Sequence, residues 1–282
     1  MKNIIVTYHK DCIDGTTAAA VVLRKFPVAQ LFPLNHSYTK EDILPVLALA
    51  DKKTEFYTVD CGLGIKEFLA TGSKVTTIDH HIGAKGLFEG TAKENKNYAF
   101  IFNNEKSGSS LAWSYFFPDE QQPELIKYVE DADLWKWQFG DDTKDINNYL
   151  SMFRNNPKTF LDFMNGDLSE IKNKGKIISM YADKEIEGQI KLPSITIKIG
   201  EHTVPAYNIT VYESASGNIL SEKIDKTVAM FTIKGNQAKL SFRSKEHHQP
   251  SSLELAQSLG GGGHKLAAGA DISLKDFLSM ID

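Results

Sequence analysis

Three short β-branched runs, each followed at once by aspartate or histidine, constrain the fold of this chain more than any other feature of its sequence. Helical patterns separate these runs, which is typical of parallel α/β folds. The ionisable residues are His9, Asp11 and Asp14 after the first expected strand, Asp60 after the third, and Asp79, His80 and His81 after the fourth. Because the carboxyl ends of parallel strands meet at one edge of a sheet, where open α/β sheets bind ligands, we expect these side chains to converge there.

The remaining elements divide the chain into two expected domains. Strands are expected at 4–8, 30–34, 56–59 and 75–78, helices at 16–25 and 41–49, helical patterns across 107–188, and further strands at 195–199, 203–209, 227–233 and 239–242. Gly188 and Pro193 mark the boundary. We therefore expect an α/β protein. Its N-terminal domain, residues 1–190, has a parallel sheet with helices on both faces and a bridging helix, and its smaller C-terminal domain, residues 191–282, is α+β.

Composition excludes several classes of protein. Hydrophobic residues make up 41% of the chain and charged residues 24%, which excludes wholesale disorder and coiled coil. The net charge of −4 excludes a protein that binds nucleic acid through general positive charge. Two cysteines, Cys12 and Cys61, cannot build a disulfide framework. No apolar run is long enough for a signal peptide or a membrane span, so we expect a cytoplasmic protein with no membrane partner.

Carboxylates and imidazoles together form a donor set for Mn²⁺, Fe²⁺, Co²⁺ or Zn²⁺. Two ions need about six to eight protein donors, with one carboxylate bridging them at about 3.5–4 Å, and the strand-end residues with Asp131 and Asp133 supply that number. A lone strand-end aspartate is more often a turn or helix-capping residue, and a lone histidine pair more often lies on the surface. For these alternatives to hold, the ionisable residues at three of the four strand ends would each have to be turn, capping or surface residues independently. That coincidence is improbable, so the sequence favours a metal site.

The order of these motifs resembles a known family. The segments Asp79-His80-His81 and Asp133-Leu134-Trp135, with the residues after the first and third strands, resemble the four motifs of the DHH phosphoesterase superfamily. The run Gly261-Gly262-Gly263-His264-Lys265-Leu266-Ala267-Ala268-Gly269 is similar to the signature of the DHHA1 substrate-binding domain. Among members, the chain most resembles short bacterial oligoribonucleases (nano-RNases) and cyclic-dinucleotide or pApA phosphodiesterases. It lacks the extra domains of RecJ exonucleases.

The resemblance implies two divalent ions, Mn²⁺ first, with Co²⁺ or Mg²⁺ as alternatives. The implied metal ligands are His9, Asp11 and Asp60 for one ion, and Asp14, Asp60, His80 and Asp133 for the other, with Asp60 as the bridge. His81 would contact the scissile phosphate or act as an acid or base, supported by Asp79. Family members space the first pair of carboxylates as Asp-x-Asp, whereas this chain has Asp11-x-x-Asp14. That departure leaves open whether Asp11 is a direct ligand.

The two carboxylates of the fourth motif are not equivalent. On a helix, Asp131 and Asp133 point about 200° apart and cannot both face the metals without local unwinding. The resemblance selects Asp133, which leaves Asp131 as a supporting or capping residue.

Phosphate-binding character recurs near the C-terminus. The glycines before His264, which include Gly262 and Gly263, free the backbone to turn its N–H groups toward an anion. Arg243 ends an expected strand and could bind a terminal phosphate bidentately. A flexible loop and a surface ion pair are the alternatives for these two features.

Three functions remain open. We favour a phosphodiesterase that hydrolyses short oligoribonucleotides or linear dinucleotides to nucleoside 5′-monophosphates by water activated between two metals. Alternatives are a pyrophosphatase, exopolyphosphatase or bisphosphate nucleotidase with the same site, or a non-catalytic nucleotide-binding protein. The expected partner is short nucleic acid or a dinucleotide, and the oligomeric state stays open, with a homodimer among the options. Tyr38, Trp113, Trp135 and Trp137 are each a core or lid aromatic or a surface on which a base stacks.

Overall fold

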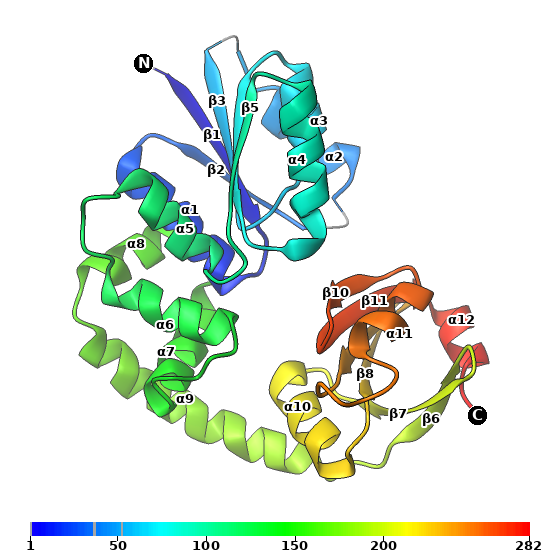
Figure 1. The fold of residues 1–282 in the computed structure, drawn as a ribbon. Helices are drawn as coiled ribbons and strands as arrows, with labels where there is room; N and C mark the ends of the chain where they lie inside the picture. The colour runs from blue at the N-terminus through cyan, green and yellow to red at the C-terminus, as the bar shows by residue number, and fades with distance from the viewer. Residues whose placement is uncertain (1, 36–37, 52) are drawn as a thin grey trace. The chain divides into compact units, whose positions relative to one another are not determined.

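The computed structural model describes residues 2–35, 38–51 and 53–282 (Figure 1). The chain divides into two compact units, Met1–Ser179 and Met180–Asp282, and the division falls within the long helix α9 (Leu168–Gln189). The boundary that the sequence predicts, after residue 190, lies just past the end of this helix. The two units are described separately below.

A five-stranded, all-parallel sheet forms the centre of the first unit. Its order is β2 (Gln30–Leu34), β1 (Asn3–His9), β3 (Thr54–Val59), β4 (Lys74–Asp79) and β5 (Tyr98–Phe102). The four strands expected from the sequence are present and parallel, so the predicted fold class is confirmed for this unit. The edge strand β5 is an addition that the sequence analysis did not anticipate.

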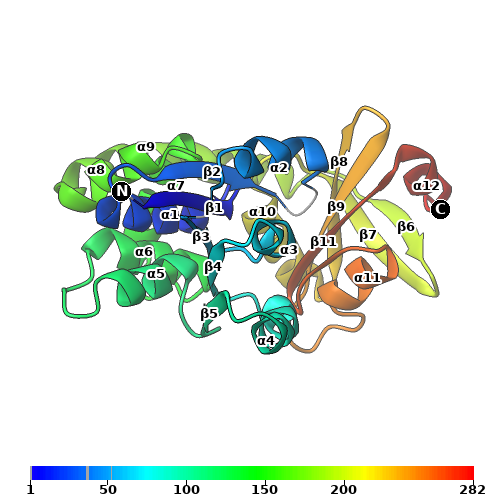
Figure 2. The ribbon, with the colours of Figure 1, turned by 90° about the horizontal axis from the view of Figure 1, so that it is seen from above.

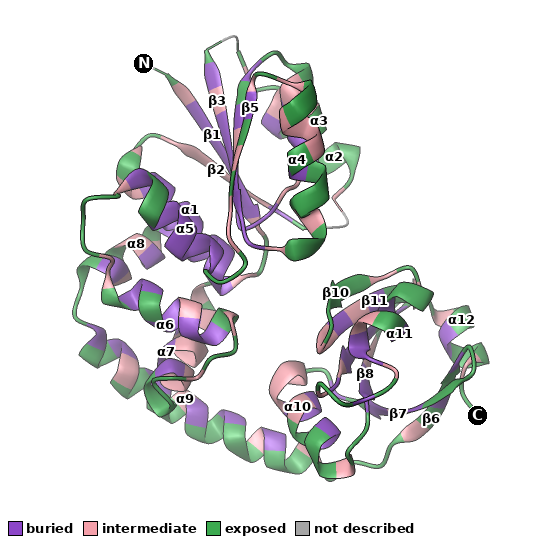
Figure 3. Ribbon diagram, viewed as in Figure 1, coloured by how far each residue is buried: buried purple, intermediate pink, exposed green. Residues whose placement is uncertain are grey.

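Helices cover both faces of this sheet because consecutive strand residues point to opposite sides. One core contains Val6, Val59 and the buried sides of α1 (Ile13–Lys25) and α5 (Gly108–Phe116). The same core is completed by α6 (Glu124–Asp133), α7 (Asp141–Leu150), the 3₁₀ turn η2 (Ser151–Phe153) and α8 (Pro157–Asn165). In Figure 3, α1 and α5 are mostly buried along their length.

The opposite face carries a second core. Ile5 and Phe56 point into it and pack with α2 (Lys40–Leu47), α3 (Ile65–Ala70) and α4 (Lys85–Glu94), which follows the 3₁₀ turn η1 (Ile82–Ala84). Figure 2 shows the sheet between these two sets of helices. Because β1, β3 and β4 are parallel neighbours, the residues that follow them lie along one edge of the sheet.

The second unit is built on a six-stranded mixed sheet. Its order is β10 (Gly262–His264), β11 (Ala267–Ser273), β9 (Gln237–Arg243), β8 (Val228–Lys234), β7 (His202–Asn208) and β6 (Ile195–Ile199), and only β7 and β8 pair in parallel among these strands. The helices α11 (Ser252–Ser258) and α12 (Leu274–Ser279) pack on one face and α10 (Glu213–Ile224) on the other. The predicted α+β architecture is confirmed.

The glycine run forms strand β10 rather than the loop that the sequence suggested. A Cβ atom at Gly261 would stand 2.1 Å from the carbonyl oxygen of Gly269, and one at Gly263 would stand 2.7 Å from that of Ala267. Gly263 also has a φ of 139°, a backbone conformation that favours glycine. These glycines therefore allow close pairing with β11.

Among the described residues, we find no helix that is both long enough and apolar enough to span a membrane.

Candidate metal centre

The residues that follow β1, β3 and β4 bring their metal-binding atoms together at the carboxyl edge of the first sheet. Three overlapping groups each have all their donor atoms within 4.8 Å of one another. The groups are His9, Cys12 and Asp60; Asp14, His80 and Asp133; and Asp60, Asp79, His80 and His81. Of the predicted metal ligands, only Asp11 is absent from these groups.

Asp60 lies at the centre of the cluster, immediately after β3. Its φ of 55° is unusual for a residue other than glycine, and its side chain is 1% exposed. Its Oδ1 lies 3.2 Å from Nε2 of His80, and its Oδ2 lies 3.6 Å from Nδ1 of His9. Burial alone would raise the pKa of Asp60, but the imidazoles of His80 and His9 outweigh it and lower that pKa.

Neither carboxylate oxygen of Asp60 accepts a hydrogen bond of normal geometry from the described residues, and Nε2 of His80 also lacks such a partner. Buried polar atoms are almost always hydrogen-bonded, so a buried carboxylate with two unsatisfied oxygens needs an explanation. A divalent cation provides one, because carboxylate oxygens and imidazole nitrogens are its usual ligands. The residues present therefore fit a metal centre.

Asp14 is held by the N-terminus of helix α5. Its Oδ2 accepts a hydrogen bond from the backbone N–H of Gly108 at 2.6 Å, and its Oδ1 accepts one from Ser109 at 3.0 Å. Burial and the charge of Asp60 nevertheless raise the pKa of Asp14 to about 6. A Cβ atom at Gly108 would stand 2.7 Å from Cβ of Asp60, so glycine is what lets α5 approach this closely.

His80 and Asp133 connect β4 with the end of α6. Nε2 of His80 lies 3.5 Å from Oδ2 of Asp133, whose side chain is 24% exposed. Although burial opposes the charged imidazole, Asp60 and the other carboxylates raise the pKa of His80 to about 10. Burial and the charges of Asp14 and Asp60 raise the pKa of Asp133 well above its usual range. The cluster thus concentrates negative charge that a cation would neutralise.

His81 and Asp79 form a hydrogen-bonded pair beside the cluster. Nδ1 of His81 lies 2.6 Å from Oδ1 of Asp79, which also accepts the backbone N–H groups of His80 and His81. Burial opposes protonation of His81, but Asp79 and Asp60 raise its pKa. Asp79 thereby fixes the orientation of the His81 ring.

Asp11 points to a different partner. Its backbone N–H donates to Oδ1 of Asn155 at 2.9 Å, and its own carboxylate accepts from Nδ2 of the same residue. The backbone φ of Asp11 is 58°, and this conformation orients the residue toward Asn155 before α1 begins. Burial and the charges of Asp60 and Asp133 raise the pKa of the neighbouring Cys12 thiol. Sequence reasoning could not find Asn155, because it lies 144 residues away along the chain.

Asp131 organises the loop that follows α6 instead of facing the cluster. Its carboxylate accepts hydrogen bonds from the backbone N–H of Gln138 at 2.8 Å and of Phe139 at 3.3 Å, and from the hydroxyl of Thr143. Its exposed fraction is 2%. It therefore ties the loop of residues 134–140 to the start of α7.

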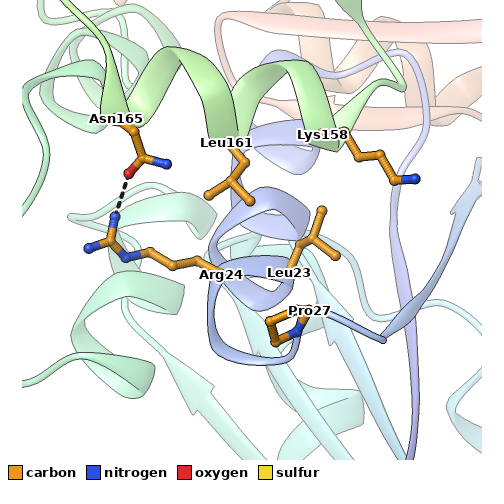
Figure 4. Close-up of a pocket in the computed structure, with 6 residues that line it drawn as sticks. All are labelled: Leu23, Arg24, Pro27, Lys158, Leu161 and Asn165. Atoms are coloured by element: carbon orange, nitrogen blue, oxygen red, sulfur yellow. Dashed lines mark hydrogen bonds between the residues drawn. The ribbon is translucent and has the colours of Figure 1, made fainter.

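A cavity lies at the other end of α1 (Figure 4). It has a volume of about 420 Å³ and is lined by Leu23, Arg24, Pro27, Lys158, Leu161 and Asn165. Arg24 donates a hydrogen bond to Asn165 at 2.7 Å across it. Asp14 and Leu23 are nine residues apart on the helix, or about 13 Å along its axis, so this cavity is separate from the metal centre.

Residues 205–282 match the family model of the DHHA1 domain. The crystal structure of the exonuclease RecJ bound to manganese is similar in fold, with 15% sequence identity, a TM-score of 0.54, and coverage of 99% of this chain and 88% of that chain. The segments that resemble the DHH motifs lie in the first unit, and the residues that match the DHHA1 domain lie in the second.

Two further proteins are similar to this chain. RecJ from Thermus thermophilus, in complex with Mn²⁺, has a TM-score of 0.57 and 16% identity, and the alignment covers 99% of this chain but 50% of RecJ. The uncharacterized protein R106 of Acanthamoeba polyphaga mimivirus is 24% identical over 298 residues, which cover 95% of this chain and 67% of R106.

In the DHHA1 unit, the predicted phosphate-binding residues share one cross-strand row. His264 of β10 and Arg243 of β9 both lie opposite Ala267 of β11, so the three side chains point to the same face of the sheet. Arg243 is half-buried and donates to the hydroxyl of Ser214 at 2.6 Å. Burial lowers the pKa of its guanidinium. Gly262 and Gly263 belong to the same exposed edge strand as His264.

A second cluster in the DHHA1 unit does not suit a metal. Asp225 lies 2.7 Å from Nε2 of His247 and 3.2 Å from Nε2 of His248. Nδ1 of His248 accepts the backbone N–H of Lys245 at 3.0 Å, which places a proton on Nε2. A protonated Nε2 donates to Asp225 and has no lone pair for a cation.

Proposed function

We propose that this chain is a metal-dependent phosphodiesterase that hydrolyses short oligoribonucleotides or linear dinucleotides to nucleoside 5′-monophosphates. The observation that carries the proposal is the buried Asp60 carboxylate. Its two oxygens lack hydrogen-bond partners in the described part of the chain and lie between two sets of donors. The match of residues 205–282 to the DHHA1 domain supports the same class of reaction. The exonuclease RecJ, which is similar in fold, is described as bound to manganese.

In this proposal, His9 and Asp60 hold one divalent ion, and Asp14, Asp60, His80 and Asp133 hold the other. Such ions would lower the pKa of water and neutralise charge that develops at phosphorus. Asp14 is kept in place by the two N–H groups of α5, so it can present a lone pair without moving. Asp60 contributes to both sets because its two oxygens face different histidines.

His81 is the proposed acid–base residue. Its Nδ1 is bound to Asp79, so proton exchange with the substrate would take place at Nε2. Asp79 holds the ring in one tautomer and stabilises its protonated form, which suits donation of a proton to a leaving oxygen. With His81 as the acid–base residue, the metal ligands take no part in proton transfer.

A nucleotide substrate is favoured over inorganic polyphosphate by the aromatic residues that follow Asp133. Trp135 is 49% exposed and lies two residues beyond Asp133, and it makes an edge contact with Trp137 at 4.9 Å between ring centroids. Both tryptophans have positive φ values, 55° and 52°, in the loop that Asp131 ties down. An exposed indole held this way offers a face on which a base can stack.

The DHHA1 unit contains the proposed binding site for a second phosphate. Arg243 and His264 lie in one row with only the small side chain of Ala267 between them, so both can reach one anion. Gly262 and Gly263 leave the backbone of this edge strand open to the same anion. A substrate with two phosphates, such as pApA or a short 5′-phosphorylated RNA, would place its second phosphate in this binding site.

The test is a product analysis with metal-free protein to which Mn²⁺, Co²⁺ or Mg²⁺ is added back. The panel contains pApA, RNAs of two to ten nucleotides, a cyclic dinucleotide, adenosine bisphosphate, pyrophosphate and polyphosphate. We expect nucleoside 5′-monophosphates from pApA and the shortest RNAs, with loss of activity in chelator. Release of inorganic phosphate from the bisphosphate, pyrophosphate or polyphosphate instead would assign the alternative function.

Asp60→Asn and Asp225→Asn form the matched pair of variants for this assay. Asp60→Asn should lose both bound metal and activity, while Asp225→Asn should keep both, because Asp225 lies in the second cluster. Circular dichroism checks that each variant is folded. Full activity of folded Asp60→Asn would contradict the proposed metal centre.

A further inference from the structure

The first motif offers two candidates for the ligand position between His9 and Asp14, and the structure separates them. Asp11 is engaged with Asn155 through both its backbone N–H and its carboxylate. Asn155 is itself fixed, because its backbone N–H donates to the hydroxyl of Thr16 at 3.1 Å and its carbonyl accepts from the hydroxyl of Tyr8 at 3.3 Å. Among the described residues, no group that could hold a metal includes Asp11.

Cys12 occupies the position that Asp11 leaves. It is the N-cap residue of α1. Its Sγ and the donor atoms of His9 and Asp60 all lie within 4.8 Å of one another. One residue separates the two aspartates of an Asp-x-Asp motif, and one residue, Ile13, likewise separates Cys12 from Asp14. A sulfur atom therefore lies where the spacing typical of the superfamily has an oxygen.

An independent observation points to a ligand at this position. Asp60, which is 1% exposed, directs two unsatisfied carboxylate oxygens into the cluster. The backbone N–H of Gly15 points at Sγ of Cys12 from 3.5 Å, in the first turn of α1. This hydrogen bond holds the sulfur at the start of α1, beside the donor atoms of His9 and Asp60.

We propose that Cys12 Sγ, and not the Asp11 carboxylate, is the third protein ligand of the ion held by His9 and Asp60. This inference rests on the proposed function and deepens it. On binding, the S–H bond of Cys12 breaks, its proton passes to the buffer, and the sulfur electron pair bonds to the cation. Thiolate favours Co²⁺, Zn²⁺ and Fe²⁺ over Mg²⁺ and Mn²⁺, so the two positions of the centre differ in metal preference.

The experiment is an optical titration of metal-free protein with Co²⁺. A thiolate ligand gives an intense near-ultraviolet charge-transfer band, which oxygen and nitrogen ligands do not give. We expect this band in the unmodified protein, in Asp11→Asn and in Cys61→Ala, which is the matched control at the other cysteine. Cys12→Ser should lack the band and bind the first-motif cation more weakly.

A second variant protects the test against a folding defect. Cys12→Asp replaces sulfur with oxygen at the same position, so it should remove the band while raising affinity for Mn²⁺ relative to Co²⁺ by about tenfold. Bound Co²⁺ without a charge-transfer band in the unmodified protein would overturn the assignment of Cys12. So would loss of a cation in Asp11→Asn with both cations retained in Cys12→Ser. Failure to bind any Co²⁺ or Mn²⁺ would instead overturn the proposed function on which this inference rests.

Discussion

Asp60, Asp14 and Asp133 gather three carboxylates around one imidazole, His80. Asp60 and Asp14 are buried, whereas the side chain of Asp133 is 24% exposed. Their pKa values diverge as a result: that of Asp60 falls, those of Asp14 and Asp133 rise, and that of His80 rises to about 10. Like charges this close cannot all ionise at low cost in a region of low dielectric. At the scale of single residues, the metal-free centre is therefore electrostatically unsatisfied.

The first prediction separates Asp133 from Asp131. Asp133→Asn removes a donor that faces His80 and Asp14, so bound metal should fall and the free energy of unfolding of the metal-free protein should change little or rise. Asp131→Asn removes the acceptor of two backbone N–H groups and a hydroxyl, so it should lower that free energy by about 1–3 kcal/mol while bound metal stays the same. Urea unfolding and metal analysis of both variants check this. The reverse pattern would show that the ligand is Asp131.

The second prediction concerns the pH dependence of the metal-free protein. The pKa of Asp14 is about 6 in the folded chain against an ordinary 3.8, and that of His80 is about 10 against 6.5. Between about pH 4 and 6, and again between about 6.5 and 10, the folded chain binds more protons than the unfolded chain. The free energy of unfolding should therefore fall as pH rises through both windows.

Urea unfolding in chelator at pH 5, 7 and 9 measures this effect. Asp14→Asn should flatten the lower window and narrow the upper one, because the charge of Asp14 also raises the pKa of His80. The depressed pKa of Asp60 acts only below about pH 4, where it opposes the trend. A metal-free protein that grows more stable from pH 5 to pH 9 would contradict the charge states described here.

At the scale of elements, the N-terminus of α5 binds the carboxylate of Asp14 and holds it in place. Two backbone N–H groups of α5 bind a carboxylate from α1, and they fix it where the helix dipole favours negative charge. The approach depends on Gly108, because a side chain there would meet both Asp60 and Asp14. The contact between α1 and α5 is thus part of the metal centre.

The third prediction follows from this contact. In Gly108→Ala, the new Cβ would stand 2.7 Å from Cβ of Asp60 and 3.0 Å from Oδ2 of Asp14, so both carboxylates must shift. Metal affinity should fall by about 10–100-fold, the usual effect of disturbing the groups that orient metal ligands. Gly90→Ala is the control, since its Cβ meets nothing within 4 Å in α4 and should stabilise the protein by about 0.5–1 kcal/mol. Calorimetric titration with Mn²⁺ measures both, and equal affinities would refute the role of Gly108.

The sequence predicted the parallel strands, because β-branched runs bounded by polar residues carry that signal locally. It missed β5, whose residues Tyr98–Phe102 form a short apolar run that is followed directly by two asparagines, and such runs are ambiguous between strand and helix. It also took Gly262–His264 as a loop, since pairing with β11 is not encoded in glycine itself. The convergence of strand ends could be predicted from topology, whereas the partners of Asp11 and Asp14 could not, because Asn155 and Gly108 are distant in sequence.

At the scale of the whole molecule, the proposed function divides two chemical tasks between the two units. The first unit holds the cluster of metal-binding atoms, and the DHHA1 unit holds the row of Arg243, Ala267 and His264. Groups that bind a part of the substrate far from the reacting bond lower the barrier only for substrates that contain that part.

The fourth prediction uses this difference. Arg243→Ala and His264→Ala should each lower kcat/KM on pApA by about 10–100-fold, in line with about 1.5–3 kcal/mol for a hydrogen bond to a charged group. Hydrolysis of bis-p-nitrophenyl phosphate, which has no second phosphate, should stay nearly the same. Lys265→Ala is the matched control, because Lys265 is exposed and pairs with Glu246 at 2.6 Å. Equal losses on both substrates would place Arg243 and His264 at the chemical step.

The unsatisfied oxygens of Asp60 also link the abundance of this protein to the metal supply of its cell. An ion that binds the folded chain and not the unfolded chain stabilises it by about 2.7 kcal/mol when the free ion is at 100 times its dissociation constant. A chain synthesised during metal starvation forgoes that stabilisation and spends more time unfolded, where proteases cleave it. Scarcity would therefore reduce the number of surviving copies as well as the activity of each one.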